Sequence, residues 1–144
     1  MTTRRYFPED WPLPHLTDVN RPFFTAGVLT LQRCRRCAQV QHPPHEICHR
    51  CQSDDFDYEP ASGLGTVDNV TVVHHPGDAR LKQRVPYNVV IVTPDDHPHL
   101  RIVGNIVNAN NTPIEIGSAV RCTFAEVPDP DTGEAIKLPQ WELQ

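Results

Sequence analysis

Four of the five cysteines in this 144-residue chain form a pattern suited to metal binding. They are two C-x2-C pairs separated by ten residues, namely Cys34, Cys37, Cys48 and Cys51. Two intervening residues let both thiolates of a tight turn face one centre, and two such turns supply the four sulfurs of a tetrahedral site. The spacing therefore predicts one structural Zn²⁺ per chain, held by these four cysteines.

Two alternatives would use the same cysteines. Disulfides would need an oxidising compartment, but charges and prolines follow Arg4 and Arg5 where an export signal would be apolar, so we expect a cytoplasmic protein. Iron remains open because it also binds four thiolates. In either metal site, four protein ligands leave no open position for water or substrate, so the metal would stabilise the fold and would not catalyse a reaction.

Charged and imidazole side chains lie next to these cysteines in the sequence. Four thiolates and one Zn²⁺ carry a net charge of about −2. The neighbouring arginines would either offset that charge or bind an anionic partner: Arg33, Arg35, Arg36 and Arg50. Three histidines are expected to be surface residues, because the cysteines already complete the ligand set: His42, His45 and His49. The fifth cysteine, Cys122, alternates with Val120 and Phe124 and is expected in the core.

Residues 1–28 are predicted to form an arm and a short helix. Aromatic residues and prolines are interleaved over 6–14, and the prolines impose an extended path that cannot build its own core. A helix is expected from Asn20 to about residue 31, with Asn20 as its cap and a proline in its first turn. The aromatic side chains of the arm either fold back onto the domain or anchor a partner protein, and the predicted anchors are Trp11, Phe23 and Phe24.

The rest of the chain is predicted to be mainly β, with a metal module over 29–62 and a barrel over 63–144. Short strands are expected in the metal module at 29–33 and 56–59. Five apolar segments predict the strands of the barrel: 66–74, 87–93, 100–107, 119–127 and 135–141. Five short strands favour a closed barrel because closure removes exposed sheet edges.

Composition narrows the classes of function. The chain has 13 basic and 18 acidic side chains, a net charge of −5, which disfavours non-specific binding to nucleic acid. No apolar run approaches the roughly 20 residues of a membrane span. The sequence also lacks the common catalytic motifs. A small hydrolase using His74 or His97 is the weakest interpretation, because both histidines are expected in solvated loops.

The order of motifs resembles one family. Leu31-Gln32-Arg33-Cys34-x2-Cys37 leads into His42-Pro43-Pro44, and the second cysteine pair is followed by Gly63-x-Gly65-Thr66-Val67, then Pro86-Tyr87 and Ile116-Gly117-x2-Val120. Over about residues 20–141 this resembles the acyl-CoA-associated zinc-ribbon/OB-fold proteins, long known as a domain of unknown function. The resemblance implies a rubredoxin-like zinc ribbon followed by a five-stranded OB-fold barrel.

The resemblance also implies a non-catalytic accessory subunit. Its partner would be a thiolase-like condensing or cleaving enzyme, a thiolase or a lipid-transfer-type aldolase, in a hetero-oligomer. That partner would act on acyl-CoA, in steroid side-chain or aromatic catabolism, and the accessory chain would stabilise it and help to form its substrate site. The basic stretch with Arg80, Lys82 and Arg84 would then be near the CoA phosphates or would be a solvated loop.

Two features qualify this interpretation. Ribbons and OB-folds also bind single-stranded nucleic acid, which is the alternative function. Such sites need aromatic platforms, and Tyr87 is the only aromatic residue between Gly65 and Val107. In addition, Ala38 and Gln52 follow the second cysteine of each pair, where such turns often use glycine, so these two turns are predicted to be strained.

Overall fold

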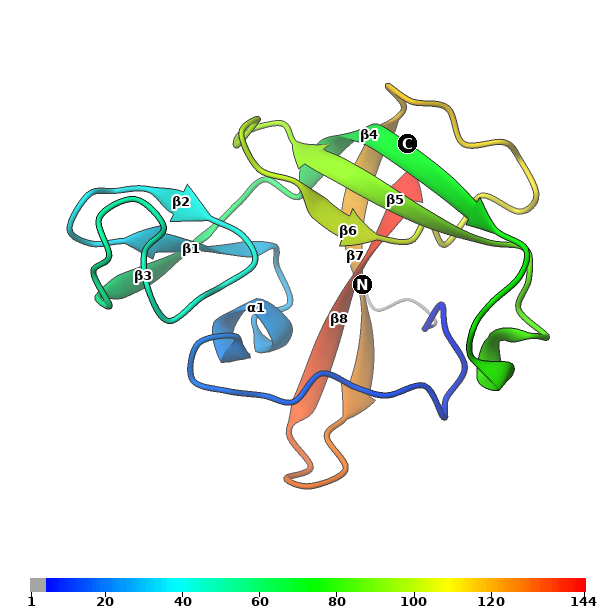
Figure 1. Cartoon of the computed structure of the whole chain (residues 1–144), viewed down its shortest axis with the longest axis horizontal. Helices are drawn as coiled ribbons and strands as arrows, with labels where there is room; N and C mark the ends of the chain where they lie inside the picture. The colour runs from blue at the N-terminus through cyan, green and yellow to red at the C-terminus, as the bar shows by residue number, and fades with distance from the viewer. Residues whose placement is uncertain (1–4) are drawn as a thin grey trace.

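The computed structural model describes residues 5–144 and has the expected mainly β architecture (Figure 1). A three-stranded sheet in the order β2-β1-β3 forms the module at one end of the molecule. A five-stranded sheet in the order β6-β5-β4-β7-β8 forms the module at the other end. Among residues 5–144, no helix has the length and apolar character needed to span a membrane.

The three-stranded sheet positions the cysteines. Its central strand is β1 (Thr30–Cys34), flanked by the antiparallel strands β2 (Val40–Gln41) and β3 (Phe56–Pro60). Strands β1 and β3 are the two that the sequence predicts. Strand β2 was not predicted, because two paired residues are too few to show the alternation that marks a strand.

The five-stranded sheet contains the five predicted barrel strands. They are β4 (Leu64–Val73), β5 (Tyr87–Pro94), β6 (Ile102–Gly104), β7 (Ala119–Pro128) and β8 (Ala135–Leu143). A single 3-10 turn, η1 (Ala79–Leu81), lies between β4 and β5. Buried and half-buried residues alternate along β5, as expected of a strand with one face on a core.

Contacts between β8 and the residues after β6 close the barrel. Ile106 and Trp141 form a parallel bridge. The backbone N–H of Trp141 donates to the carbonyl of Asn105 at 2.9 Å, and the N–H of Val107 donates to the carbonyl of Trp141 at 2.8 Å. The two outer strands of the sheet therefore meet, and Trp141 is completely buried inside. This arrangement confirms the expected OB-fold barrel.

The N-terminal helix is shorter than predicted. Helix α1 (Arg21–Thr25) has a proline in its first turn, but Gly27 adopts a φ of +75° just beyond its end. Asn20 is the N-cap residue, yet its side chain accepts a hydrogen bond from the N–H of Thr17 at 2.7 Å and makes none to the helix. Helix α1 packs against β1 and β8 and is tied to the β7–β8 hairpin by an ion pair between Arg21 and Glu134.

The described part of the arm folds back onto the barrel. The backbone N–H of Tyr6 donates to Oε1 of Gln140 at 2.7 Å, and the Tyr6 hydroxyl accepts a hydrogen bond from Nδ2 of Asn88 at 2.9 Å. The ring of Phe7 meets Tyr87 edge-on, with centroids 5.5 Å apart. Of the two arrangements left open by the sequence, this chain on its own adopts the one in which the arm contacts its own barrel.

Candidate metal centre

The four predicted ligands converge at one end of the three-stranded sheet. The sulfurs of Cys34 and Cys51 are 3.5 Å apart, those of Cys37 and Cys48 are 3.6 Å apart, and all four lie within 4.8 Å of one another. A Zn–S bond of about 2.3 Å requires sulfurs about 3.8 Å apart in a tetrahedron. A disulfide would bring two sulfurs to about 2.0 Å. The geometry therefore fits a four-thiolate metal site and not a pair of disulfides.

The two cysteine turns are built in the same way. Ala38 donates its N–H to the carbonyl of Cys34 at 2.9 Å, and Gln52 donates its N–H to the carbonyl of Cys48 at 3.0 Å. Ala38 and Gln52 have φ values of 66° and 65°, in the left-handed region that favours glycine. The strain predicted at these two positions is confirmed, and it is the same strain in both halves of the site.

Backbone hydrogen bonds lower the pKa of two of the four clustered thiols. Those from Cys51 and Arg50 lower the pKa of the Cys48 thiol to about 6, and Arg50 donates its N–H to that sulfur at 3.4 Å. Backbone hydrogen bonds from Cys37 and Arg36 lower the pKa of the Cys34 thiol in the same manner. A metal that needs thiolates therefore competes with fewer protons at these two sulfurs. The pKa of the Cys51 thiol is instead raised to about 11, because a backbone hydrogen bond from Ser53 is outweighed by burial and by hydrogen bonds with the other three sulfurs.

Carboxylates of β3 pair with two of the four nearby arginines. Arg35 contacts Asp57 at 2.7 Å, and Arg33 contacts Glu59 at 3.3 Å. Both pairs are largely solvent-exposed, so each contributes little to stability. Because these two guanidinium groups already face carboxylates of this chain, they are poorly placed to bind an anionic ligand.

The histidines of this region are not ligands of the four-sulfur cluster. His45 and His49 are exposed, as expected, and their rings lie 4.7 Å apart. His42 differs from the expectation: it is half-buried, with its ring 4.9 Å from that of Phe23. Burial, and to a smaller extent His45, lowers the pKa of His42 to about 4.

A buried glutamine pair next to the cysteines was missed by the sequence analysis. Gln32 on β1 and Gln41 on β2 are almost completely buried, and Nε2 of Gln41 donates to Oε1 of Gln32 at 2.8 Å. Both side chains also bond the backbone of the loop that leads to Cys48. The one signal in the sequence is a glutamine next to Leu31 in a predicted strand, which does not reveal its partners.

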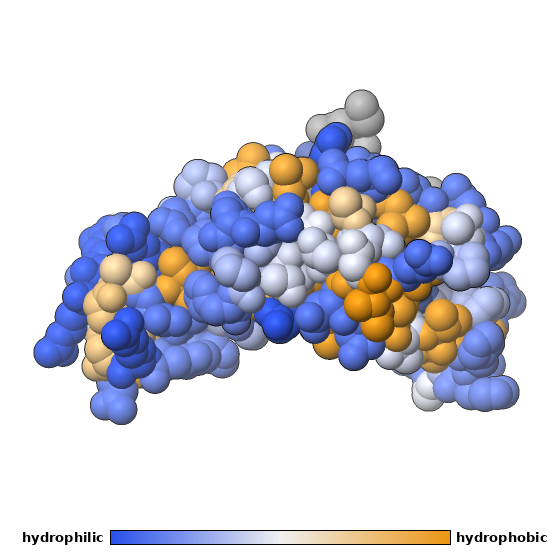
Figure 2. Space-filling model, turned by 90° about the horizontal axis from the view of Figure 1, so that it is seen from above, coloured by the Kyte–Doolittle hydropathy of each residue, from blue (hydrophilic) through white to orange (hydrophobic). Residues whose placement is uncertain are grey.

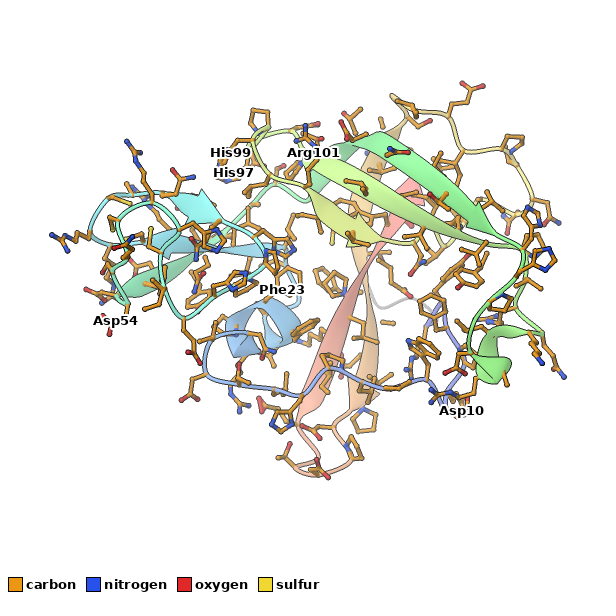
Figure 3. The ribbon with its side chains drawn as sticks, viewed as in Figure 1. Asp10, Phe23, Asp54, His97, His99 and Arg101 are labelled. Carbon is orange, nitrogen blue, oxygen red and sulfur yellow. The ribbon has the colours of Figure 1, made fainter. Side chains whose placement is uncertain are left out.

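The remaining candidate residues do not assemble a catalytic site. His74 follows the end of β4 that pairs with Tyr87, whereas His97 follows the opposite end of β5, so the two lie at opposite ends of the barrel. His97 instead lies 3.7 Å from Glu59 of β3, where the β5–β6 loop meets the three-stranded module (Figure 3). Burial raises the pKa of the Cys122 thiol to about 12, which keeps it unreactive.

A groove of about 1150 Å³ lies between the arm, the loop around η1 and the β7–β8 hairpin. Arg80 and Trp11 form part of its wall, with the guanidinium carbon 4.9 Å from the ring centroid. Asp78 binds the same guanidinium group at 2.7 Å. The groove is separate from the cysteine cluster, because none of the four cysteines lines it.

Comparisons with known proteins agree with this architecture. Residues 25–57 match the family model described as the rubredoxin-like zinc ribbon domain of ChsH2, and residues 58–125 match its C-terminal OB-fold domain. A DUF35 domain-containing scaffold protein of Methanothermobacter thermautotrophicus is 31% identical over 100 residues, which cover 69% of this chain and 73% of that protein. This chain belongs to the DUF35 family.

Two further similarities are to proteins that are named after enzymes. A probable enoyl-CoA hydratase alpha subunit of Thermomonospora curvata is 34% identical over 123 residues, or 83% of this chain. The chain spans only 37% of that relative's length. A solved structure named Ltp2-ChsH2(DUF35) aldolase has a TM-score of 0.73 and 32% identity, covering 91% of this chain and 98% of that one.

Proposed function

We propose that Cys34, Cys37, Cys48 and Cys51 hold one structural Zn²⁺. The four-sulfur geometry and the zinc-ribbon family model support this proposal, and thiolates suit both zinc and iron. Bound there, the metal would fasten the two cysteine turns to each other and supply no open coordination position. Metal analysis of the purified chain tests the proposal: one zinc per chain is expected, and iron in its place would contradict it.

We propose that the chain is a non-catalytic accessory subunit of a thiolase-like enzyme acting on acyl-CoA. The observation that carries this proposal is the similarity to Ltp2-ChsH2(DUF35) aldolase over 98% of that chain, because the whole fold is shared and not one of its two modules. We keep thiolases and lipid-transfer-type aldolases as the partner class, in steroid side-chain or aromatic catabolism.

The surface for that partner is proposed around the arm. Trp11 and Phe24 are half-buried, so part of each aromatic ring is accessible to a second protein. Phe23 is only 7% exposed and belongs to the chain's own core. Apolar side chains also gather over the barrel, as Figure 2 shows, and Val103 of β6 is 67% exposed. Exposed apolar area of this kind favours a protein partner.

The nucleic-acid alternative is weaker on the same surface. Its sole aromatic platform between Gly65 and Val107 would be Tyr87, whose ring is already packed against Phe7 of the arm. The basic stretch is also partly neutralised, since Arg80 is bound by Asp78. This surface therefore offers few of the accessible aromatic rings and unpaired cationic side chains that binding of single-stranded nucleic acid requires.

Co-expression tests the accessory function. A tagged copy of this chain is produced together with a thiolase-like candidate partner, and the complex is analysed by size-exclusion chromatography. Co-elution is expected, and Trp11→Ala is expected to weaken it at least tenfold if Trp11 is an anchor. Ile47→Ala serves as the control, because Ile47 is an exposed apolar residue in the loop after β2, outside the arm and the barrel. Elution of the wild-type chain alone, with the partner present, would contradict the proposal.

A further inference from the structure

The loop that bears the second cysteine pair is held by side chains rather than by backbone pairing with the sheet. Residues 42–49 run from the end of β2 to the residue after Cys48 without forming a strand. Gln32 binds this loop at His45 through both ends of its amide: Oε1 accepts from the His45 N–H at 3.0 Å, and Nε2 donates to the His45 carbonyl at 2.7 Å. The side chain thereby makes the two hydrogen bonds that a neighbouring strand would make.

Gln41 repeats this role closer to the metal ligands. Its Oε1 accepts from the N–H of His49 at 2.9 Å, and its Nε2 donates to the carbonyl of Ile47 at 3.3 Å. These two backbone groups stand on either side of Cys48. The position of the Cys48 sulfur therefore depends on an amide group that is itself fixed on β2.

The two side-chain amides belong to one series of hydrogen bonds in which every bond runs from donor to acceptor in the same direction. From the N–H of His49 the chain passes through Gln41 to Gln32. From Nε2 of Gln32 it continues to the hydroxyl of Tyr58 at 3.2 Å, and that hydroxyl donates to the carbonyl of Val19 at 2.7 Å. Hydrogen bonds aligned in this way strengthen one another when they are shielded from water. Leaving one of the buried amides without a partner would lower the stability of the fold.

We propose that the Gln32–Gln41 pair positions the second cysteine turn, so that its thiolates face Cys34 and Cys37 before a metal arrives. The backbone bonds within each turn shape that turn only. The Gln32–Gln41 pair sets the distance between the two turns, together with the N–H of Arg35, which donates to the carbonyl of Asp55 at 3.0 Å. The inference rests on the proposed zinc site. It makes Gln32 and Gln41 positioning residues, which touch the loop and not the metal.

Zinc affinity of the full-length chain tests the inference, with Zn²⁺ titrated against a chromophoric chelator. Gln41→Met keeps the length of the side chain and removes its hydrogen bonds, and a 10- to 100-fold loss of affinity is expected, as for other residues that orient metal ligands. Gln39→Met is the matched control, because the side chain of Gln39 donates to the carbonyl of Val40 at 3.3 Å, while its backbone bond to Cys34 is kept in the variant. Affinity of Gln41→Met within twofold of wild type would overturn the inference.

A second measurement uses the unaltered protein and does not depend on how the variant folds. In the metal-free wild-type chain, the amides of His45 and His49 are expected to exchange with solvent at least tenfold more slowly than the Arg50 amide, whose acceptor is the Cys48 sulfur. Equal exchange at the three amides would overturn the inference. A wild-type chain that binds no zinc would instead refute the metal proposal, and amide exchange would still decide whether the glutamine pair holds the loop.

Discussion

Ala38 and Gln52 are equivalent residues in the two halves of the cysteine cluster. Each has a left-handed backbone, with φ of 66° and 65°, and each donates its N–H to the carbonyl of the first cysteine of its pair. Neither is glycine, so both halves of the site carry the same conformational cost. The cost arises because the Cβ of each residue is strained in this conformation, which glycine adopts without a steric penalty.

Replacing either residue by glycine should therefore stabilise the ribbon. A non-glycine residue in this region costs about 1–2 kcal/mol of stability. Glycine removes that cost but offsets about 0.5–1 kcal/mol of the gain, because it loses more conformational entropy on folding. We expect Ala38→Gly and Gln52→Gly each to raise the free energy of unfolding by up to about 1 kcal/mol in chemical denaturation. Ala26→Gly, at an ordinary φ of −70°, should lower it, and a gain there equal to the gain at Ala38 would refute this explanation.

Gly104 should not tolerate a side chain, because it faces the residue that closes the barrel. A Cβ at this position would lie 2.6 Å from Cδ1 of Trp141, and Trp141 is fully buried. We expect Gly104→Ala to lower the free energy of unfolding by about 1–3 kcal/mol. Gly77→Ala is the control, since no heavy atom lies within 4 Å of its added Cβ. Equal effects at the two sites would contradict the proposed close approach.

Stability should fall between pH 6.5 and pH 4 because of His42. Its pKa is about 4 in the folded chain, against 6.5 for an exposed histidine, so the unfolded chain binds more protons in this window. The corresponding stability is fully present above pH 6.5, and about 2 kcal/mol of it should be lost at pH 5.

The variant His42→Phe isolates this contribution in urea unfolding at pH 7 and pH 5. Acid also weakens metal binding by thiolates, but that effect is common to both proteins. The wild type should lose about 2 kcal/mol more than the variant on acidification. Identical losses in the two proteins would show that His42 does not titrate as described.

Metal removal should change the reactivity of four thiols and leave the fifth unchanged. With metal bound, we expect slow alkylation of all cysteines at pH 8. Chelation should release the four clustered thiols, while Cys122 should react only after unfolding, because burial raises its pKa to about 12. Mass spectrometry of the labelled chain checks this order. Early labelling of Cys122 would place it outside the packed region.

Local patterns were sufficient to predict much of this fold. The C-x2-C spacing located the four-cysteine cluster, because two residues between cysteines determine a tight turn, whatever surrounds it. The apolar run at Val89–Val92 located β5 for a similar reason, since a short continuous apolar run indicates a strand within a few residues. The resemblance to zinc-ribbon/OB-fold proteins then supplied the fold of each module, a rubredoxin-like ribbon followed by an OB-fold barrel.

Features that depend on distant parts of the chain were not predictable. The partners of Gln32 are backbone atoms of His45, which only the folded loop brings near. The sequence also could not decide whether the arm folds back, because the contact that holds it joins the Tyr6 hydroxyl to Asn88, which is 82 residues away. The helix was extended too far because its end is set by the positive φ of Gly27, which the sequence permits but does not require.

Activity of a thiolase-like partner, assayed on acyl-CoA with and without this chain, tests the proposed function most directly. The complex should turn over substrate at least tenfold faster than the partner alone, and this chain alone should show no turnover. A variant with Cys48→Ser and Cys51→Ser, which removes half of the metal ligands, should fail to stimulate the partner. Equal rates with and without the wild-type chain would contradict the account.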